Sequence, residues 1–276
     1  MRAMANDPAG DTLADLLAFA DTLADAARAV VVKHFRSDLA VDHKDSASPR
    51  GQPVTVADRD AEAAIRALIE ARYPDHGIVG EELGSRHPDA DWQWLIDPID
   101  GTRAFIAGLP LFGTLIGLGH LGRPVLGVID QPVLGERFVG SRAGAFLNGA
   151  PIRTRACPRL ERAVFALTDP DMMAGPAERA AYRTLRRGAA VTQLGGNCYA
   201  YAMLAAGAID LVVEADLKPW DIYALVPVVE AAGGVIADWS GGPAAAASRV
   251  IACGDTALYD QVAPLLAGAA PANDAA

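Results

Sequence analysis

The chain has 276 residues, enough to bury a sizeable core as one large domain or two smaller ones. Half of the residues are hydrophobic, but no run of 18 apolar residues occurs, so we expect no membrane-spanning helix and no membrane partner. The net charge of −10 argues against a broad nucleic-acid-binding surface, which needs a basic face. The start of the chain lacks the apolar core of a signal peptide, and three widely spaced cysteines suggest reduced thiols, so we expect a cytoplasmic protein.

The first part of the chain predicts two amphipathic helices. Residues 11–36 place apolar side chains at helical spacing along one stripe. A polar loop follows from Ser37 to Pro53, which we interpret either as a surface loop or as a flap over an active site. Residues 54–58 then lead into a second helix that ends before Pro74. Asp58 lies at or near the start of that helix, where the simplest interpretation is an N-cap.

Two apolar stretches come next, and each ends in acidic residues. Residues 77–80 form a short strand that ends at Glu81. Residues 94–96 predict a buried strand, followed at 97–102 by the segment Asp-Pro-Ile-Asp-Gly-Thr. Ligands bind at the carboxyl ends of strands in layered α/β proteins. The two acids of this segment suit a hard cation, and the backbone amides that follow suit an anion; those amides belong to Gly101, Thr102 and Arg103.

The rest of the first half predicts an antiparallel sheet, and the second half alternates strands with helices. Strand patterns cover 114–119, 124–129, 137–140 and 145–147, and a tight turn follows at residues 148–149. The composition changes near residue 155, so we expect an N-terminal α+β domain (1–155) and a C-terminal α/β domain (156–276). The second half predicts strands and helices in turn. The strands are 163–168, 191–194, 209–213, 235–237 and 250–252, and the helices are 177–187, 198–206, 221–232 and 257–266.

Four acids at the ends of these elements are candidates for a metal site. Glu81, Asp97 and Asp100 follow consecutive strands and could share one edge of a sheet. Asp221 opens a helix in the second half, where it could also act simply as a helix-dipole partner. The five histidines have no ligand spacing, so we expect no zinc site. Oxygen ligands favour Mg²⁺, with Mn²⁺ as the alternative, and two or more cations would offset the repulsion among the acids.

Three sequence blocks resemble the inositol monophosphatase family of metal-dependent phosphatases. They are Val-Gly-Glu-Glu at 79–82, Trp-Leu-Ile-Asp-Pro-Ile-Asp-Gly-Thr at 94–102 and Lys-Pro-Trp-Asp at 218–221, in the family's order and at similar spacings. The resemblance covers roughly residues 10 to 266. It implies an αβαβα sandwich, with N-terminal helices and an antiparallel sheet before a C-terminal α/β half, and it implies a homodimer.

The resemblance also implies a role for each site residue. Two or three Mg²⁺ ions would be bound by the side chains of four acids and by the carbonyl oxygen of Ile99; the acids are Glu81, Asp97, Asp100 and Asp221. Thr102 and Asp58 would orient and activate the attacking water. The phosphate would lie on the amides of Gly101 and Thr102, beside Arg103. The rest of the substrate would contact Gly196, Asn197 and Glu214.

Four further segments are similar to the histidinol-phosphate phosphatases of this family: 103–110, 125–132, 195–201 and 214–221. The cationic groups of histidinol phosphate would suit Glu214, Asp216 and Asn197, although the subgroup often has Asp at the position of Asn197. We therefore predict a phosphomonoester hydrolase that converts histidinol phosphate to histidinol and phosphate in histidine biosynthesis.

Two classes of alternative stay open at this point. Within the phosphatases, the substrate could be inositol monophosphate, fructose bisphosphate or a nucleotide 3′-phosphate. The chain could instead be a non-catalytic regulatory protein that binds metal and phosphate. The intact pair of Asp58 and Thr102 argues against this second class, because binding alone needs no proton relay.

Overall fold

The computed structural model describes residues 10–38, 40–43 and 53–269. Most of the predicted polar loop, including residues 44–52, lies outside this part of the chain. Within the described residues, no helix is both long enough and apolar enough to cross a membrane.

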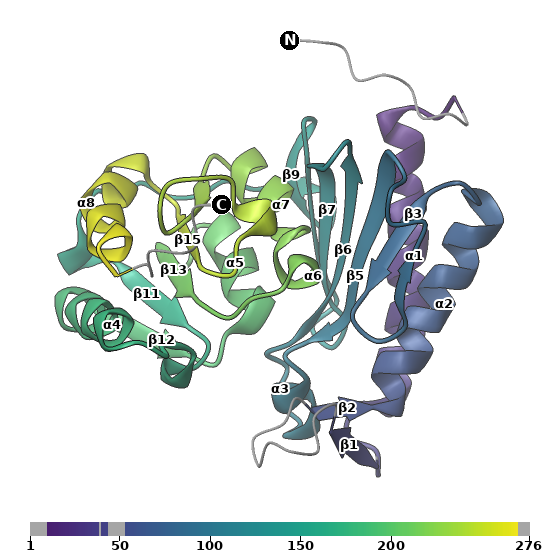
Figure 1. Cartoon of the computed structure of the whole chain (residues 1–276), viewed down its shortest axis with the longest axis horizontal. Coiled ribbons are helices and arrows are strands. Elements are labelled where there is room, and N and C mark those ends of the chain that lie inside the picture. Colours follow the sequence, from purple (N-terminus) through teal and green to yellow (C-terminus); the bar gives the residue numbers. More distant parts are fainter. Residues whose placement is uncertain (1–9, 39, 44–52, 270–276) are drawn as a thin grey trace.

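The chain folds into alternating layers of helices and sheets (Figure 1). Two long helices pack on each other and on the outer face of a large sheet, and apolar side chains fill the space between them. Three helices lie between this sheet and a smaller one, and two helices cover the far face of the smaller sheet. These layers confirm the predicted αβαβα sandwich. In order, the helices are α1 (Leu13–His34) and α2 (Val56–Arg72), then α5 (Asn197–Ala205), α6 (Pro219–Ile222) and α7 (Leu225–Ala231), then α4 (Pro176–Gly188) and α8 (Thr256–Ala267).

The large sheet has eight strands in the order β10-β9-β8-β7-β6-β5-β3-β4. It is antiparallel, as predicted, except that β3 and β5 run parallel to each other. In that pair Gly80 lies opposite Ile96, so the acids that follow leave the sheet side by side. The strands are β3 (Gly77–Gly80), β4 (Gly84–Arg86), β5 (Trp92–Asp100), β6 (Gly113–His120), β7 (Arg123–Gln131), β8 (Glu136–Ser141), β9 (Gly144–Leu147) and β10 (Ala150–Pro151).

The smaller sheet has five strands in the order β12-β11-β13-β15-β14. β11 is parallel to both of its neighbours, and the other pairs are antiparallel. Its strands all follow residue 163, whereas the large sheet ends at residue 151. This separation supports the division near residue 155, which we keep as a proposal. The strands are β11 (Val164–Leu167), β12 (Val191–Leu194), β13 (Leu211–Glu214), β14 (Val235–Asp238) and β15 (Val250–Cys253).

Short elements connect these layers near the cleft described below. A two-stranded sheet precedes α2, a single helical turn follows β5, and a 3₁₀ turn follows β11. They are β1 (Val41–His43), β2 (Pro53–Thr55), α3 (Thr102–Ile106) and η2 (Pro170–Met172), and two further 3₁₀ turns are η1 (Leu160–Arg162) and η3 (Ala244–Ala246).

The single helix predicted for 221–232 is wrong, because this region forms two short helices, α6 and α7. The break falls at Tyr223 and Ala224, although both have helical backbone angles. Pro227 explains it, because its nitrogen carries no hydrogen and its ring crowds the carbonyl of residue 223. The first of the two helices, α6, contacts β5 and β6 of the large sheet and carries Asp221.

The inner helix layer touches the large sheet where that sheet has glycines. A Cβ at Gly127 would lie 1.9 Å from the carbonyl oxygen of Ala224, and a Cβ at Gly140 would lie 2.3 Å from Cα of Val228. The backbone around α7 therefore rests directly on β7 and β8. This contact also sets the distance between the large sheet and α6, the helix that carries Asp221.

We expect Gly127→Ala to destabilise the protein by about 3 kcal/mol, since the new methyl group would force α7 away from the sheet. Equilibrium unfolding in urea measures this change. Gly268→Ala is the matched control, because its φ of −71° suits alanine and its Cβ would lie 3.7 Å from the nearest atom. The control should stay within about 0.5 kcal/mol of wild type. Equal stabilities for the two variants would refute this account of the helix–sheet contact.

Candidate active site

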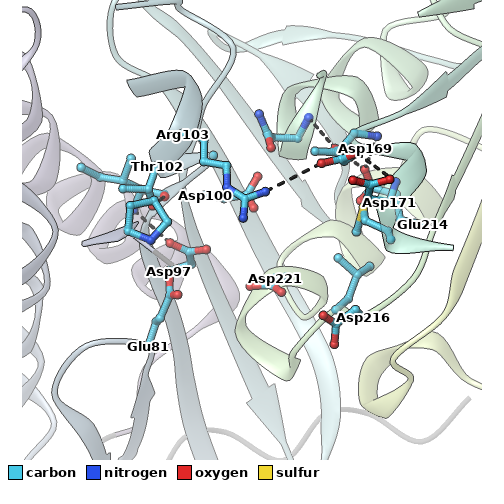
Figure 2. A pocket seen from close by; sticks show the side chains of 17 residues that line it. Glu81, Asp97, Asp100, Thr102, Arg103, Asp169, Asp171, Glu214, Asp216 and Asp221 are labelled. Carbon is cyan, nitrogen blue, oxygen red and sulfur yellow. Dashed lines mark hydrogen bonds and ion pairs between the residues drawn. The ribbon is translucent and has the colours of Figure 1, made fainter. Parts of the chain in front are cut away.

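A cleft of about 410 Å³ lies between the two sheets (Figure 2), and the strands of both sheets that reach it do so at or near their carboxyl ends. β3 and β5 supply one wall, and the ends of β11 and β13 supply the other. Among the described residues 17 line it, and these include eight acids and one basic residue, Arg103. The acids are Glu81, Asp97, Asp100, Asp169, Asp171, Glu214, Asp216 and Asp221. The cleft is therefore strongly anionic.

Three of these acids meet closely enough to hold one metal ion. Asp97, Asp100 and Asp221 each offer a carboxylate oxygen, and these oxygens lie within 4.8 Å of one another. A bulge in β5 between Asp97 and Asp100 turns both acids toward the cleft. The bulge is held by Thr114, whose hydroxyl donates to the Pro98 carbonyl at 2.8 Å. Glu81 lies beside Asp97 on the same wall (Figure 2).

Asp221 and Asp100 are each fixed by a backbone amide. The amide of Lys218, the N-cap residue of α6, donates to Asp221 at 2.8 Å, so Asp221 lies in the first turn of α6, at its third position, and binds back to the start of that helix. The amide of Cys198, in the first turn of α5, donates to Asp100. The amide of Ile99 donates to Asp97 at 3.0 Å, so two acids from one strand and one from a distant helix are each held by a backbone amide.

Burial makes the ionised form of these three acids energetically unfavourable. Burial and the charge of Glu81 raise the pKa of Asp97 well above its ordinary value. Burial and the charge of Asp100 do the same for the pKa of Asp221. Burial raises the pKa of Asp100 to about 6, against the lowering effect of Cys198. A set of buried carboxylate oxygens that repel one another fits a hard divalent cation, which would remove the repulsion.

The structure brings Asp58 and Thr102 together. The hydroxyl of Thr102 lies 3.4 Å from Oδ1 of Asp58 and 3.1 Å from the carbonyl oxygen of Ile99. The other carboxylate oxygen of Asp58 accepts from the amide and the hydroxyl of Thr55, at 2.8 Å and 2.6 Å. Thr55, not Asp58, is the N-cap of α2, and Asp58 is the third residue of its capping box. The interpretation of Asp58 as the N-cap is therefore wrong, because the N-cap lies three residues earlier, at Thr55.

Asp58 is almost fully buried, and this burial raises the pKa of its carboxyl group. One carboxylate oxygen is committed to the helix start, and the other faces Thr102. Capping and proton acceptance can therefore coexist in this residue.

Glu214 is buried at the end of β13 on the opposite wall. Its carboxylate accepts from the amide of Thr168 at 3.1 Å and from the Thr168 hydroxyl, and Tyr201 lies 3.3 Å away. Burial raises the pKa of Glu214 to about 7, against the lowering effect of Thr168. This acid can therefore change its charge near neutral pH.

Asn197 joins the two halves of the chain in this structure. Its side-chain amide donates to the carbonyl of Leu111 at 2.6 Å, and its backbone amide donates to the Thr168 hydroxyl at 3.0 Å. Gly101 makes room for it, since a Cβ there would lie 2.7 Å from the Asn197 amide nitrogen and its φ is +94°. Gly196 starts α5 but is buried and does not line the cleft.

Several lining residues were not among the predicted site residues: Pro53, Thr168, Asp169, Asp171, Met172 and Leu217. Asp169 lies 3.8 Å from Arg103, so this ion pair crosses the cleft from one half of the chain to the other (Figure 2). Polar residues directly after a predicted strand are the signal that marked Asp97. The same signal occurs at the end of the strand predicted for 163–168, which in the structure ends at Leu167, and could have identified Thr168 and Asp169.

Known proteins have the same fold and similar sequences. The model of the inositol monophosphatase family matches residues 12–270. The chain belongs to the inositol monophosphatase family. It is 44% identical over 256 residues to the chloroplastic bifunctional phosphatase IMPL2 of Arabidopsis thaliana, covering 88% of this chain and 72% of that protein. It is 40% identical over 191 residues to the histidinol-phosphatase of Chlorobaculum parvum, covering 68% and 73%.

A solved structure of an inositol monophosphatase from Zymomonas mobilis aligns with a TM-score of 0.82 at 43% identity, covering 93% of this chain and 99% of that one. Family membership and these relatives identify the chain as a phosphatase.

The raised pKa values predict how a divalent cation changes stability with pH. Asp97, Asp100 and Asp221 hold more protons in the folded, cation-free protein than in the unfolded chain above about pH 4, so their contribution to stability falls as pH rises, for Asp100 through about pH 6. A cation binds the ionised acids and removes this loss. We expect excess Mg²⁺ to raise Tm by about 5 °C or more near pH 8 and by less than about 2 °C near pH 5, measured by calorimetry against EDTA. Equal shifts at both pH values, or an undiminished shift in Asp97→Asn, would contradict the metal site.

Proposed function

We propose that the protein is a Mg²⁺-dependent phosphomonoester hydrolase that converts histidinol phosphate to histidinol and phosphate. Two or three Mg²⁺ ions would be held by the carbonyl oxygen of Ile99 and by four acids: Glu81, Asp97, Asp100 and Asp221. When bound, such cations neutralise phosphoryl oxygens, lower the pKa of water and stabilise the leaving oxygen. We further propose a cytoplasmic homodimer that acts in histidine biosynthesis, with a small phosphorylated substrate as its ligand.

The residues of the first half would position the phosphate and remove a proton from water. The amides of Gly101 and Thr102 would hold the phosphate, with the cation of Arg103 beside it. A water molecule on the Thr102 hydroxyl would give up its proton through that hydroxyl to Asp58, whose raised pKa suits a proton acceptor. The alcohol product would leave toward the wall formed by the second half.

The acidity of that second wall is the observation that carries the choice of substrate. Four acids line it outside the three-acid group: Asp169, Asp171, Glu214 and Asp216. They lie on the opposite side of the cleft from Glu81 and Asp97 (Figure 2). A neutral polyol gains little from such a wall, whereas the amine and imidazole of histidinol can both be cations. The histidinol-phosphatase of Chlorobaculum parvum supports the same choice.

Inositol monophosphate is the second candidate substrate. The neutral hydrogen-bonding groups of Thr168 and Asn197 lie in the same wall and could bind sugar hydroxyls. The solved structure from Zymomonas mobilis also carries the name of an inositol monophosphatase. A non-catalytic regulatory protein is less favoured, because the contact between Asp58 and Thr102 has no use in binding alone.

A comparison of substrates tests the proposal directly. With Mg²⁺ present, kcat/KM for histidinol phosphate should exceed that for inositol monophosphate by about tenfold or more, as measured by phosphate release. Glu214→Gln should raise KM for histidinol phosphate about tenfold. It should change activity on the phosphate monoester of a small uncharged alcohol less than about threefold. Glu230→Gln on α7 is a control without effect on either substrate. Faster hydrolysis of inositol phosphate by wild type would overturn the choice of substrate.

The proton relay has its own test. Asp58→Asn and Thr102→Ala should each lower kcat by about 100-fold or more with little change in KM, because the water loses its proton acceptor. Asp15→Asn is a control for the lost helix-start contact at an exposed site. In α1, Asp15 accepts from the amide and hydroxyl of Thr12 at 2.9 Å and 2.6 Å, the same hydrogen-bond pattern as in α2. The control should lose about 1 kcal/mol of stability and keep its kcat. Unchanged kcat in both relay variants would refute the mechanism.

A further inference from the structure

Glu62 is a fully buried carboxylate next to the cleft that does not line it. It lies on α2, one helical turn after Asp58 and on the same face. Its partners are the backbone of the turn that joins β3 to β4. Oε2 accepts from the amide of Glu82 at 2.7 Å, and Oε1 accepts from the amide of Leu83 at 3.1 Å. These two amides directly follow Glu81.

Arg66 completes this arrangement one turn further along α2. Its Nη1 lies 3.1 Å from Oε1 of Glu62 and 2.8 Å from the carbonyl oxygen of Gly84. Helix α2 therefore holds both ends of the turn: Glu62 binds two backbone amides of the turn, and Arg66 binds the carbonyl of Gly84 at its end. Gly80 leaves the space for this contact, since a Cβ there would lie 1.9 Å from Oε1 of Glu62.

The backbone of Glu81 is consequently fixed from both sides. Before it, the strand β3 is paired to β5, and the Glu81 amide donates to the carbonyl of Ile96 at 3.2 Å. After it, the next two amides are bound to Glu62. A surface turn of three residues can form without two charge-assisted hydrogen bonds. Here these bonds require a buried carboxylate, which is energetically unfavourable, so a role beyond holding the turn is expected.

We propose that Glu62 is a positioning residue that fixes Glu81 for metal binding, a role that rests on the proposed function. Outer groups that orient metal ligands typically contribute 10- to 100-fold to metal affinity. Glu62→Gln keeps the shape, but it removes the charge and replaces one of the two acceptor oxygens by an NH2 donor, which would face one of the backbone N–H groups. We therefore expect the variant to bind Mg²⁺ about tenfold more weakly than wild type in calorimetric titration, and excess Mg²⁺ should restore most of kcat.

Glu178→Gln supplies a matched control in the other half of the chain. Glu178 is also buried, accepts from the backbone amide of Gly175 at 2.8 Å and pairs with Arg249 at 2.7 Å. It lies outside the cleft, so this variant should lose similar stability and keep wild-type Mg²⁺ affinity. Recovery of Glu62→Gln by Mg²⁺ distinguishes positioning from a purely structural role. Arg66→Met, which removes the cation beside Glu62, should weaken Mg²⁺ binding about threefold and provides the test if Glu62→Gln does not fold.

The outcomes separate the two proposals. Wild-type Mg²⁺ affinity in a folded Glu62→Gln or, if that variant does not fold, in Arg66→Met would overturn the role of Glu62, provided that Asp97→Asn still weakens binding. An Asp97→Asn variant that binds Mg²⁺ as tightly as wild type would instead overturn the metal site, and the role of Glu62 with it.

Discussion

Repulsion between buried carboxylates is the constraint on which the rest of this structure depends. Asp97, Asp100 and Asp221 lie within 4.8 Å of one another in a largely buried cleft, where each charge disfavours the others. The fold offsets part of this cost by giving the acids local structural partners. Asp221 accepts from the N-cap residue of α6, and Asp100 accepts from the first turn of α5. Each acid is thus held by the backbone even while its charge is unfavourable, which leaves the site ready for a cation.

The helix α2 shows how one element can organise several parts of such a site. Its buried face packs on α1 and the large sheet through Ala57, Ala61 and Ile65. The same packing fixes Asp58 and Glu62, which are four residues apart and point the same way. Asp58 reaches Thr102 after β5, and Glu62 reaches the turn after β3. The helix register therefore sets the distance between the proposed proton acceptor and the turn that carries Glu81.

Much of the fold and of the acidic wall could be predicted, because their signals are local in the sequence. The two strand ends at Glu81 and Asp97 were visible as apolar runs followed by acids, and the parallel pairing of β3 and β5 places them together. Contacts between distant segments could not be predicted. The bond from Asn197 to Leu111 and the contact of Arg103 with Asp169 depend on how the two halves face each other. No local feature of the sequence distinguishes Glu62 from a solvated acid on an amphipathic helix, because its partners lie in the turn after β3.

The two ends of the cleft depend on different parts of the structure. The proposed metal end is formed by the ends of β3 and β5, and Asp221 is the one contribution to the three-acid group from the second half. The other end is built from the carboxyl ends of β11 and β13, tied to the first half through Asn197. Substitutions around Thr168 and Glu214 can therefore reshape the end of the cleft proposed for the leaving group while Glu81 and Asp97, which take no part in the hydrogen bonds described above for either residue, keep their places. A fold arranged in this way can keep one hydrolytic reaction while its choice of phosphate ester changes.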